Sequence, residues 1–273
     1  MPTCEEEKSM GVNTIPTAPD KIRSLIRSGA WQNITAGLAP NHVQANLVIL
    51  PMAQAFDFLL FCQRNPRPCP LLEVLEPGVI EPAKTAPGAD IRTDLPKYRV
   101  YREGKLDREV SDINMEWRDD LVSFLLGCSF TFEAALLSAG IPLRHIDQGK
   151  NVAMYKTNIE TQAAGVFSGP TVVSMRPVRH KQVVKAVQVT SRFPDAHGAP
   201  FHIGAPEAIG VNAISTPDYG DFVGIREDEV PMFWACGVTP QAVAAASNPP
   251  LMITHAPGYM FVTDLKDEEL AVL

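Results

Sequence analysis

The first part of the chain shows two apolar stripes at helical spacing, separated by a continuous apolar run. The first stripe begins after Thr17–Asp20, where a capping threonine, a proline and an acidic residue mark a helix start, and it ends at Gly29. The run NHVQANLVILP stops at Pro51, and the second stripe covers Met52–Arg64. The pattern predicts two helices with a buried apolar segment between them.

Short apolar runs bounded by glycine and proline follow over the rest of the chain, and such runs are typical of strands. Strands are expected at Leu71–Leu75, Val152–Thr157, Thr171–Met175, Ala208–Val211, Met232–Ala235, Met252–Thr254 and Tyr259–Val262, with a hairpin formed by Tyr98–Tyr101 and Lys105–Arg108. Helices are expected at Trp117–Leu126, Phe132–Ser138 and Val178–Phe193. Strand, helix and strand in succession suggest an α/β unit in the middle of the chain.

These elements predict an α/β (or α+β) fold, in which a mixed-sheet main domain carries layered helices. The main catalytic domain is expected to combine residues 17–148 and 203–273, and a smaller α/β subdomain is expected as an insertion at 149–202. Residues 1–16 are polar and show no period, so we expect them to form a disordered tail.

Composition and charge narrow the function classes. The 273 residues are 45% apolar, which is normal for a globular protein with a packed core. The net charge is -7 and no stretch is rich in lysine or arginine, so nucleic-acid binding is disfavoured. No apolar run reaches the roughly 20 residues needed to span a bilayer, and the acidic N-terminus is unlike a targeting peptide. We therefore expect a soluble, cytoplasmic protein that binds neither nucleic acid nor membrane, and base rates favour a homodimer.

Ten segments spread along the chain carry a family resemblance. They include FCQRNPRPCPLLEV from Phe61, LGCSFTFEAAL from Leu126, VVSMRP from Val172 and WACGVTPQ from Trp234. Together they resemble the D-glutamate cyclase family, whose members are also called hydro-lyases. One departure is Ala153, where the family usually carries proline. The resemblance implies a lyase of amino-acid metabolism that interconverts D-glutamate and 5-oxo-D-proline with loss or gain of water.

The implied reaction sets chemical requirements on the site. Closing glutamate onto itself needs a base for the amine, an acid for the departing oxygen and donors for the oxyanion. It needs no nucleotide, and the chain contains no GxxxxGK[ST] phosphate-binding loop. We therefore expect a small carboxylate substrate and no required cofactor, while a divalent metal ion stays open as an alternative.

Two of the five cysteines are candidate catalytic residues. Cys4, Cys62, Cys69, Cys128 and Cys236 form no CxxC pair and are odd in number, which disfavours a disulfide framework and a thiolate zinc site. Cys128 and Cys236 each follow an apolar run and adjoin a glycine. A thiol at a helix N-terminus has a lowered pKa and can pass a proton. The alternative is that both are small buried hydrophobic residues, as free cysteine usually is.

Two arginines are candidates for binding substrate carboxylates. A guanidinium makes bidentate contacts with a carboxylate, and Arg176 ends an apolar strand, where ligands often bind. Arg92 lies in an aspartate-rich loop, so a structural ion pair is its alternative role. Ser129 and Thr239 flank the two cysteines and could complete a substrate or oxyanion pocket.

Histidines in glycine- and proline-rich turns are candidates for proton transfer or metal binding. His202 is predicted to act in catalysis, because an imidazole titrates near neutrality. His197, His202, Asp218 and Asp221 are weak candidates for a divalent metal site with mixed nitrogen and oxygen ligands, but their spacing matches no established motif. Bracing of loops is the alternative for each histidine. His145 lies in a polar segment that we expect to be exposed, and it receives no role.

Two other functions stay open beside the cyclase. One is a dehydratase or racemase-like proton-transfer enzyme on another small carboxylic acid, which paired thiols would serve equally well. The other is a non-catalytic, carboxylate-binding regulatory protein. Convergence of Cys128, Cys236 and Arg176 on one site would favour a thiol-based enzyme, and their separation would exclude it.

Overall fold

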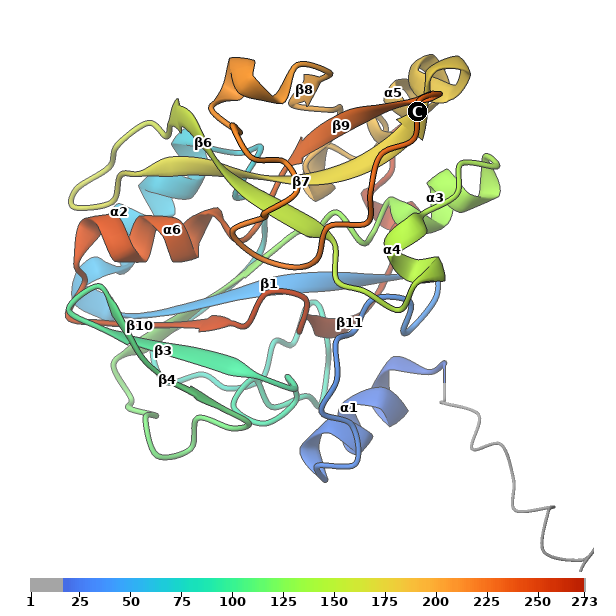
Figure 1. Cartoon of the computed structure of the whole chain (residues 1–273). Helices are drawn as coiled ribbons and strands as arrows, with labels where there is room; N and C mark the ends of the chain where they lie inside the picture. Colours follow the sequence, from blue (N-terminus) through green and yellow to red (C-terminus); the bar gives the residue numbers. More distant parts are fainter. Residues whose placement is uncertain (1–16, 273) are drawn as a thin grey trace, which may run out of the picture.

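The structure is a computed structural model that describes residues 17–272. The predicted disordered tail at 1–16 lies outside the described residues. Two antiparallel sheets lie one above the other, and helices fill or flank the space between them (Figure 1). Every strand pair in the described part of the chain is antiparallel. The predicted α/β (or α+β) class is confirmed, and the antiparallel pairing corresponds to its α+β form.

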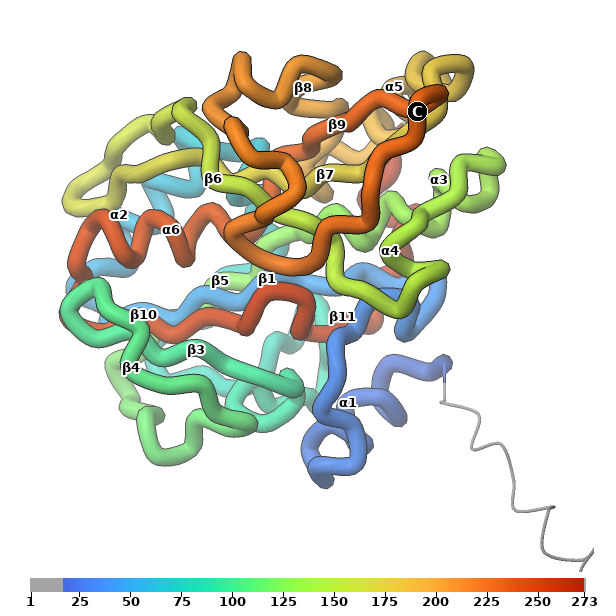
Figure 2. The backbone as a smooth tube through the Cα atoms, viewed as in Figure 1, coloured from blue at the N-terminus to red at the C-terminus, as the bar shows by residue number. Residues whose placement is uncertain are grey.

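The first sheet joins the two ends of the chain. Its strand order is β2-β5-β1-β10-β3-β4, and β11 also pairs with β1. The strands are β1 (His42–Pro51), β2 (Leu71–Leu75), β3 (Tyr98–Arg102), β4 (Lys105–Val110), β5 (Leu121–Leu126), β10 (Leu251–His255) and β11 (Phe261–Lys266). In Figure 2 the blue β1 runs beside the red β10 and β11, which come from the far end of the chain.

The second sheet is smaller and has the order β6-β7-β9-β8. Its strands are β6 (Ala153–Glu160), β7 (Pro170–Arg179), β8 (His202–Ile203) and β9 (Glu229–Ala235). β9 lies beyond the predicted inserted subdomain at 149–202, yet it completes the sheet that β6 and β7 begin. The boundaries of that subdomain therefore remain a prediction.

Most helices cover the sheets or lie between them. The α-helices are α1 (Pro19–Arg27), α2 (Met52–Arg64), α3 (Glu133–Ser138), α4 (Arg144–Asp147), α5 (Val183–Thr190) and α6 (Thr239–Ser247). Short 3₁₀ helices are η2 (His180–Gln182), η3 (Pro194–Ala196), η4 (Pro206–Ile209) and η5 (Asp267–Leu270). α2 and α6 share one apolar cluster with the first sheet, and Figure 1 shows them between the sheets. Among the described residues, no helix is long and apolar enough to cross a membrane.

The alternation of side chains along β1 determines what faces the second sheet. Val43, Ala45, Leu47 and Ile49 pack into the core on the outer face, beneath the long loop before β3. Val48 and Leu50 pack into the cluster between the sheets. Because side chains two apart share a face, Asn46 also projects into the space between the sheets. A buried amide in this position requires hydrogen-bond partners.

Three predicted elements are wrong in part. Trp117–Leu126 was expected to be a helix, but Leu121–Leu126 forms the central strand β5, which is buried on both faces. Such a strand shows no alternation and cannot be distinguished from a buried helix by periodicity. The predicted strand Ala208–Val211 overlaps a 3₁₀ helix, and the start of the predicted helix Val178–Phe193 belongs to β7.

Candidate active site

The two candidate thiols meet in the space between the sheets. Cys128 follows β5 of the first sheet and Cys236 follows β9 of the second, and both belong to one apolar cluster. They lie close enough for their charges to interact. Each is buried but retains a small exposed fraction, 6% for Cys128 and 7% for Cys236. The sequence places them 108 residues apart, and the packing of the two sheets brings them together.

Asn46 contacts the backbone turns that carry both thiols. Its side-chain Nδ2 donates to the Gly127 carbonyl at 2.5 Å, directly before Cys128. Gly237, directly after Cys236, approaches the same amide so closely that a Cβ there would lie 2.0 Å from Nδ2. A side chain at Gly237 would therefore displace Asn46.

Both thiols are protonated at neutral pH. Burial raises the pKa of Cys236 to about 11, although the Val238 backbone and Arg176 act in the opposite direction. Burial raises the pKa of Cys128 still further. The lowered pKa expected from the sequence is therefore wrong, because desolvation exceeds the effect of the backbone N–H groups. The two groups are proton donors rather than preformed thiolates.

Arg176 lies in the same buried region, and four of its five N–H donors have partners within the protein. Nε and Nη2 donate to Glu133 Oε1 at 3.0 and 2.5 Å, Nη2 also donates to Ser129 Oγ, and Nη1 donates to Ser174 Oγ. Burial favours the neutral form of Glu133, yet the charges and polar contacts of Arg176 and His145 together outweigh it and lower the Glu133 pKa. His145 lies 3.0 Å from the same carboxylate without hydrogen-bond alignment.

Arg176 is therefore mainly a structural cation in this arrangement. Its guanidinium lies 5.3 Å from the Phe132 ring and 5.5 Å from the Trp234 ring, and the residue is 1% exposed. A substrate carboxylate would have to displace Glu133 to make a bidentate contact with the Arg176 guanidinium. The expectation that His145 is exposed is wrong, because it is 2% exposed beside Glu133.

His197, one of the turn histidines considered for proton transfer or metal binding, has the features of a base. Its Nδ1 lies 2.6 Å from the Arg67 carbonyl, so the proton resides on Nδ1 and Nε2 is the acceptor. Nε2 has no hydrogen-bond partner although His197 is 1% exposed. Burial lowers the His197 pKa to about 4, so the imidazole is neutral at physiological pH.

A cavity of about 480 Å³ adjoins His197, and Cys62, Arg67, Cys69 and Asp195 also line it. We call it the His197 cavity. The Cys69 thiol in its wall lies close enough to Cys236 for their charges to interact. The loop that carries His197 packs on Gly127, where a Cβ would lie 1.8 Å from the Asp195 carbonyl oxygen. The cavity thus borders the region of the two thiols.

Two other predicted residues make local contacts instead. Arg92 pairs with Asp90, at 2.7 Å between Nη2 and Oδ2, as its alternative role anticipated. Thr239 Oγ1 donates to the Cys236 carbonyl at 2.7 Å and accepts the Val172 N–H at 3.0 Å, so it braces the turn after Cys236.

The predicted metal ligands are not assembled. His202 lies at the partly exposed edge strand β8, with Nε2 2.9 Å from the Ala205 carbonyl. Asp218 accepts the Lys156 N–H and Asp221 accepts the Asn151 N–H. Within residues 17–272, no group of three or more histidine, cysteine, aspartate or glutamate side chains is arranged to hold a metal ion.

Comparison with known proteins identifies the family. A family model described as D-glutamate cyclase matches residues 122–264, which include both thiols and Arg176. The chain belongs to the D-glutamate cyclase family. A protein of Geobacillus kaustophilus is 62% identical over 258 residues, which cover 94% of this chain and 98% of that one. A protein of Bacillus subtilis is 60% identical over 256 residues, which cover 94% of this chain and 100% of that one.

Both relatives carry the name "Putative hydro-lyase", and so does a protein of Stutzerimonas stutzeri that is 60% identical over 94% of this chain and 97% of its own. Among solved structures, a nitrogen repressor-like protein from Methanococcus jannaschii is similar at a TM-score of 0.36 and 11% identity, covering 87% of this chain and 92% of that one. A similarity this low carries no argument about fold or function.

The structure reveals three buried polar residues near the candidate thiols and Arg176 that the sequence analysis did not name as site residues: Asn46, Glu133 and His145. Asn46 had a visible signal, because it interrupts an otherwise apolar run. Glu133 and His145 had none, because they lie on α3 and α4 and approach Arg176 of β7 only in the folded chain.

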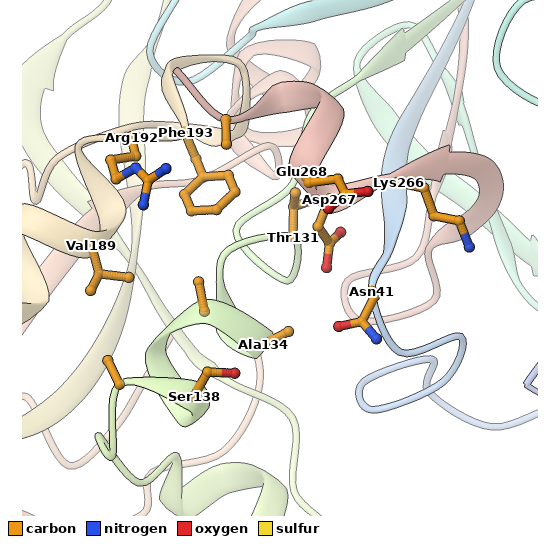
Figure 3. Close-up of a pocket in the computed structure, with 13 residues that line it drawn as sticks. Asn41, Thr131, Ala134, Ser138, Val189, Arg192, Phe193, Lys266, Asp267 and Glu268 are labelled. Carbon is orange, nitrogen blue, oxygen red and sulfur yellow. The ribbon is translucent and has the colours of Figure 1, made fainter. Parts of the chain in front are cut away.

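A second cavity, of about 730 Å³, lies between α3, the end of α5 and η5. Figure 3 shows Asp267 among the side chains that line it, together with Thr131 and Arg192. We call it the Asp267 cavity. Asp267 Oδ1 is buried without a hydrogen-bond partner, and burial raises the Asp267 pKa to about 7 against the opposing charge of Lys266.

Asp267→Asn is expected to stabilise the fold at neutral and higher pH. The pKa of Asp267 is higher in the folded chain than in the unfolded chain. Between about pH 4 and pH 7, Asp267 therefore ionises in the unfolded chain while it stays protonated in the folded chain, and the wild-type protein loses stability as the pH rises. Asparagine removes that loss. Because the carboxylate is partly exposed, we expect a gain of about 1–2 kcal/mol at pH 8 and little difference near pH 4. Urea unfolding of both proteins from pH 4 to 8 measures it; a difference that stays constant with pH would contradict the assignment.

Proposed function

We propose that this chain interconverts D-glutamate and 5-oxo-D-proline with loss or gain of one water molecule, as a carbon–oxygen hydro-lyase. Family membership and the names of the relatives support a hydro-lyase in general. The observation that carries the proposal is the meeting of the Cys128 and Cys236 thiols, which are buried, protonated and still slightly exposed. A purely structural pair of cysteines would not require that exposure.

The reaction exchanges one bond for another and moves protons between them. The substrate nitrogen bonds to the carbon of the γ-carboxyl group (Cδ), and one carbon–oxygen bond of that group breaks. Starting from the neutral amine and the protonated γ-carboxyl group, the nitrogen loses one proton, and the departing hydroxyl group gains one and leaves as water. Hydrolysis of the lactam is the same path reversed. The site must therefore hold one group that accepts a proton and one that donates it.

We assign the acid role to Cys236 and the base role to His197. Cys236 has the lower pKa of the two thiols, so it is the better proton donor to the departing oxygen. His197 is neutral, and its Nε2 is free to accept a proton from the amine. After one turnover the imidazolium returns its proton to the thiolate, which restores both groups.

Basic side chains near Cys236 are suited to hold substrate carboxylates, in place of the occupied Arg176. Tyr219 lies close enough to Cys236 for their charges to interact. The Arg99 guanidinium lies 6.0 Å and the Lys156 Nζ 5.8 Å from the centre of the Tyr219 ring. Both cations therefore lie beside Tyr219, and Arg99 also donates to Glu109 Oε1 at 2.8 Å. An anionic substrate would be attracted to these cations.

The test is incubation of the purified chain with D- and L-glutamate and with both 5-oxoprolines, followed by mass spectrometry. We expect water loss or gain with the D-enantiomers only. When the incubation is run in D₂O, deuterium incorporation at the α-carbon without loss of water would instead indicate the racemase-like alternative. Binding without any conversion would indicate a carboxylate-binding regulatory protein.

His197→Asn is expected to lower turnover about 10²- to 10⁴-fold, the usual contribution of general acid–base catalysis. The backbone φ of His197 is +77°, which asparagine tolerates better than most residues. Its amide can replace Nδ1–H as donor to the Arg67 carbonyl, but it cannot replace the basic Nε2. The melting temperature should therefore change little. Steady-state kinetics on folded variant decide the matter: normal turnover would remove His197 from the mechanism.

A further inference from the structure

The Asp267 cavity contains two buried polar groups that the protein itself leaves unsatisfied. Thr131 is 1% exposed and its Oγ1 has no hydrogen-bond partner. Asp267 Oδ1 is also buried and has none. Figure 3 shows the two side chains near one another on the same side of the cavity, although they come from the segment before α3 and from η5. Native proteins seldom leave such groups unpaired, and a ligand is one way to satisfy them.

The charges around the cavity are of both signs. Arg192 and Lys266 supply two cations, and Asp267 and Glu268 supply two carboxylates. Figure 3 shows Arg192 on the α5 side and Lys266 beyond Asp267. A ligand with one sign of charge would satisfy only half of this set. A zwitterion, with an ammonium and a carboxylate group, matches both halves.

Apart from Asn41 and Ser138, the rest of the wall is apolar. Ala134, Ala135, Val189, Phe193 and Ala271 line it. A volume of about 730 Å³ is within the range of small-molecule sites, which combine mostly apolar walls with a few polar groups. An apolar side chain on the ligand would bury surface against this wall, whereas a second carboxylate would not.

We propose that the Asp267 cavity binds an amino acid with an apolar side chain. Its ammonium group donates to Asp267 and to the Thr131 hydroxyl, its carboxylate accepts from Arg192, and its side chain packs against Val189 and Phe193. Neither thiol lines the cavity, although the Thr131 N–H donates to the Cys128 carbonyl at 3.1 Å. The proposal does not depend on the cyclase activity. The cavity adjoins α3, which also carries Glu133, the partner of Arg176.

Titration calorimetry of the full chain with leucine as the probe tests the proposal. We expect leucine to bind at pH 8. Two analogues, 4-methylpentanoate without the ammonium and 3-methylbutylamine without the carboxylate, should each bind at least about tenfold more weakly, because each lacks one charged contact. An analogue that binds as tightly as leucine would overturn the assignment of that contact, and absence of leucine binding would overturn the site.

Substitutions in the cavity provide the second part of the test. Asp267→Asn and Thr131→Val should weaken leucine binding, by about tenfold or more for the charged residue. Glu207→Gln changes an exposed carboxylate outside the cavity and should leave affinity within about twofold. If Asp267→Asn, which we expect to be at least as stable as wild type, binds leucine normally, the proposal is wrong.

Binding should also weaken as pH falls from 8 to 6, because Asp267 must be ionised to pair with the ammonium group. The charged groups around it are Lys266 and Glu268 on its own segment and Arg192 across the cavity. His42 is a second titrating group within reach, since its Nε2 lies 2.7 Å from Lys266 Nζ. The pH dependence should persist in His42→Gln and disappear in Asp267→Asn; the opposite pattern would assign it to His42 and overturn the role of Asp267.

Discussion

Cys236→Ser should lower turnover about 10²- to 10⁴-fold while the protein remains folded. Serine nearly preserves the volume of cysteine, but its hydroxyl pKa lies far above that of the thiol, which is already raised to about 11. The variant would therefore lose the proton donor and keep the shape. Cys128→Ser should have a smaller effect, because Cys128 is the weaker acid of the pair.

A matched control separates chemistry from packing. Val48 is fully buried, belongs to a different apolar cluster and lines neither cavity. Val48→Thr places a hydroxyl in a buried apolar site just as Cys236→Ser does, so both variants should lose a similar stability, about 1–3 kcal/mol. Only Cys236→Ser should lose turnover per folded molecule. Equal turnover in the two variants would end the thiol-based proposal.

Arg176→Met is expected to destabilise the fold by about 3–5 kcal/mol, because it leaves the buried Glu133 carboxylate without its cation. This differs from the role in carboxylate binding that the sequence predicted. Double replacement with Glu133→Gln should recover much of the loss, since no uncompensated charge then remains buried. Chemical denaturation of both variants measures the difference.

The same two variants can also show that Arg176 binds substrate instead of stabilising the fold. If Arg176→Met unfolds at the wild-type denaturant concentration but shows a raised Michaelis constant, Arg176 binds substrate and its contact with Glu133 is secondary. A double variant no more stable than the single one would show that the ion pair is not the source of the loss.

Local signals in the sequence predicted many elements well. The helix at Met52–Arg64 and the strand at Leu71–Leu75 have the predicted bounds, because each shows periodicity and is bounded by proline. The central strand β5 was misassigned because burial on both faces removes the alternation. α6 was not predicted, and its alanine-rich sequence offers no polar face against which an apolar stripe could be recognised.

The candidate site was predictable only in its residue types. Cysteines beside glycines suggested Cys128 and Cys236, and the structure brings them together. Their raised pKa values were not predictable, because they result from burial between two sheets, and the strands that carry the two thiols are far apart in the sequence. The contact between Arg176 and Glu133 was not predictable for a similar reason: the two residues are 43 positions apart, on β7 and α3, and meet only because α3 packs against the second sheet.

Hydrolysis of 5-oxo-D-proline in water enriched in oxygen-18 tests the central claim most directly. If the chain adds water to the lactam carbon, the D-glutamate formed carries the label in its γ-carboxylate and not in its α-carboxylate, and Cys236→Ser forms it far more slowly. If no labelled D-glutamate forms, or if wild type and Cys236→Ser form it at equal rates, the account is contradicted.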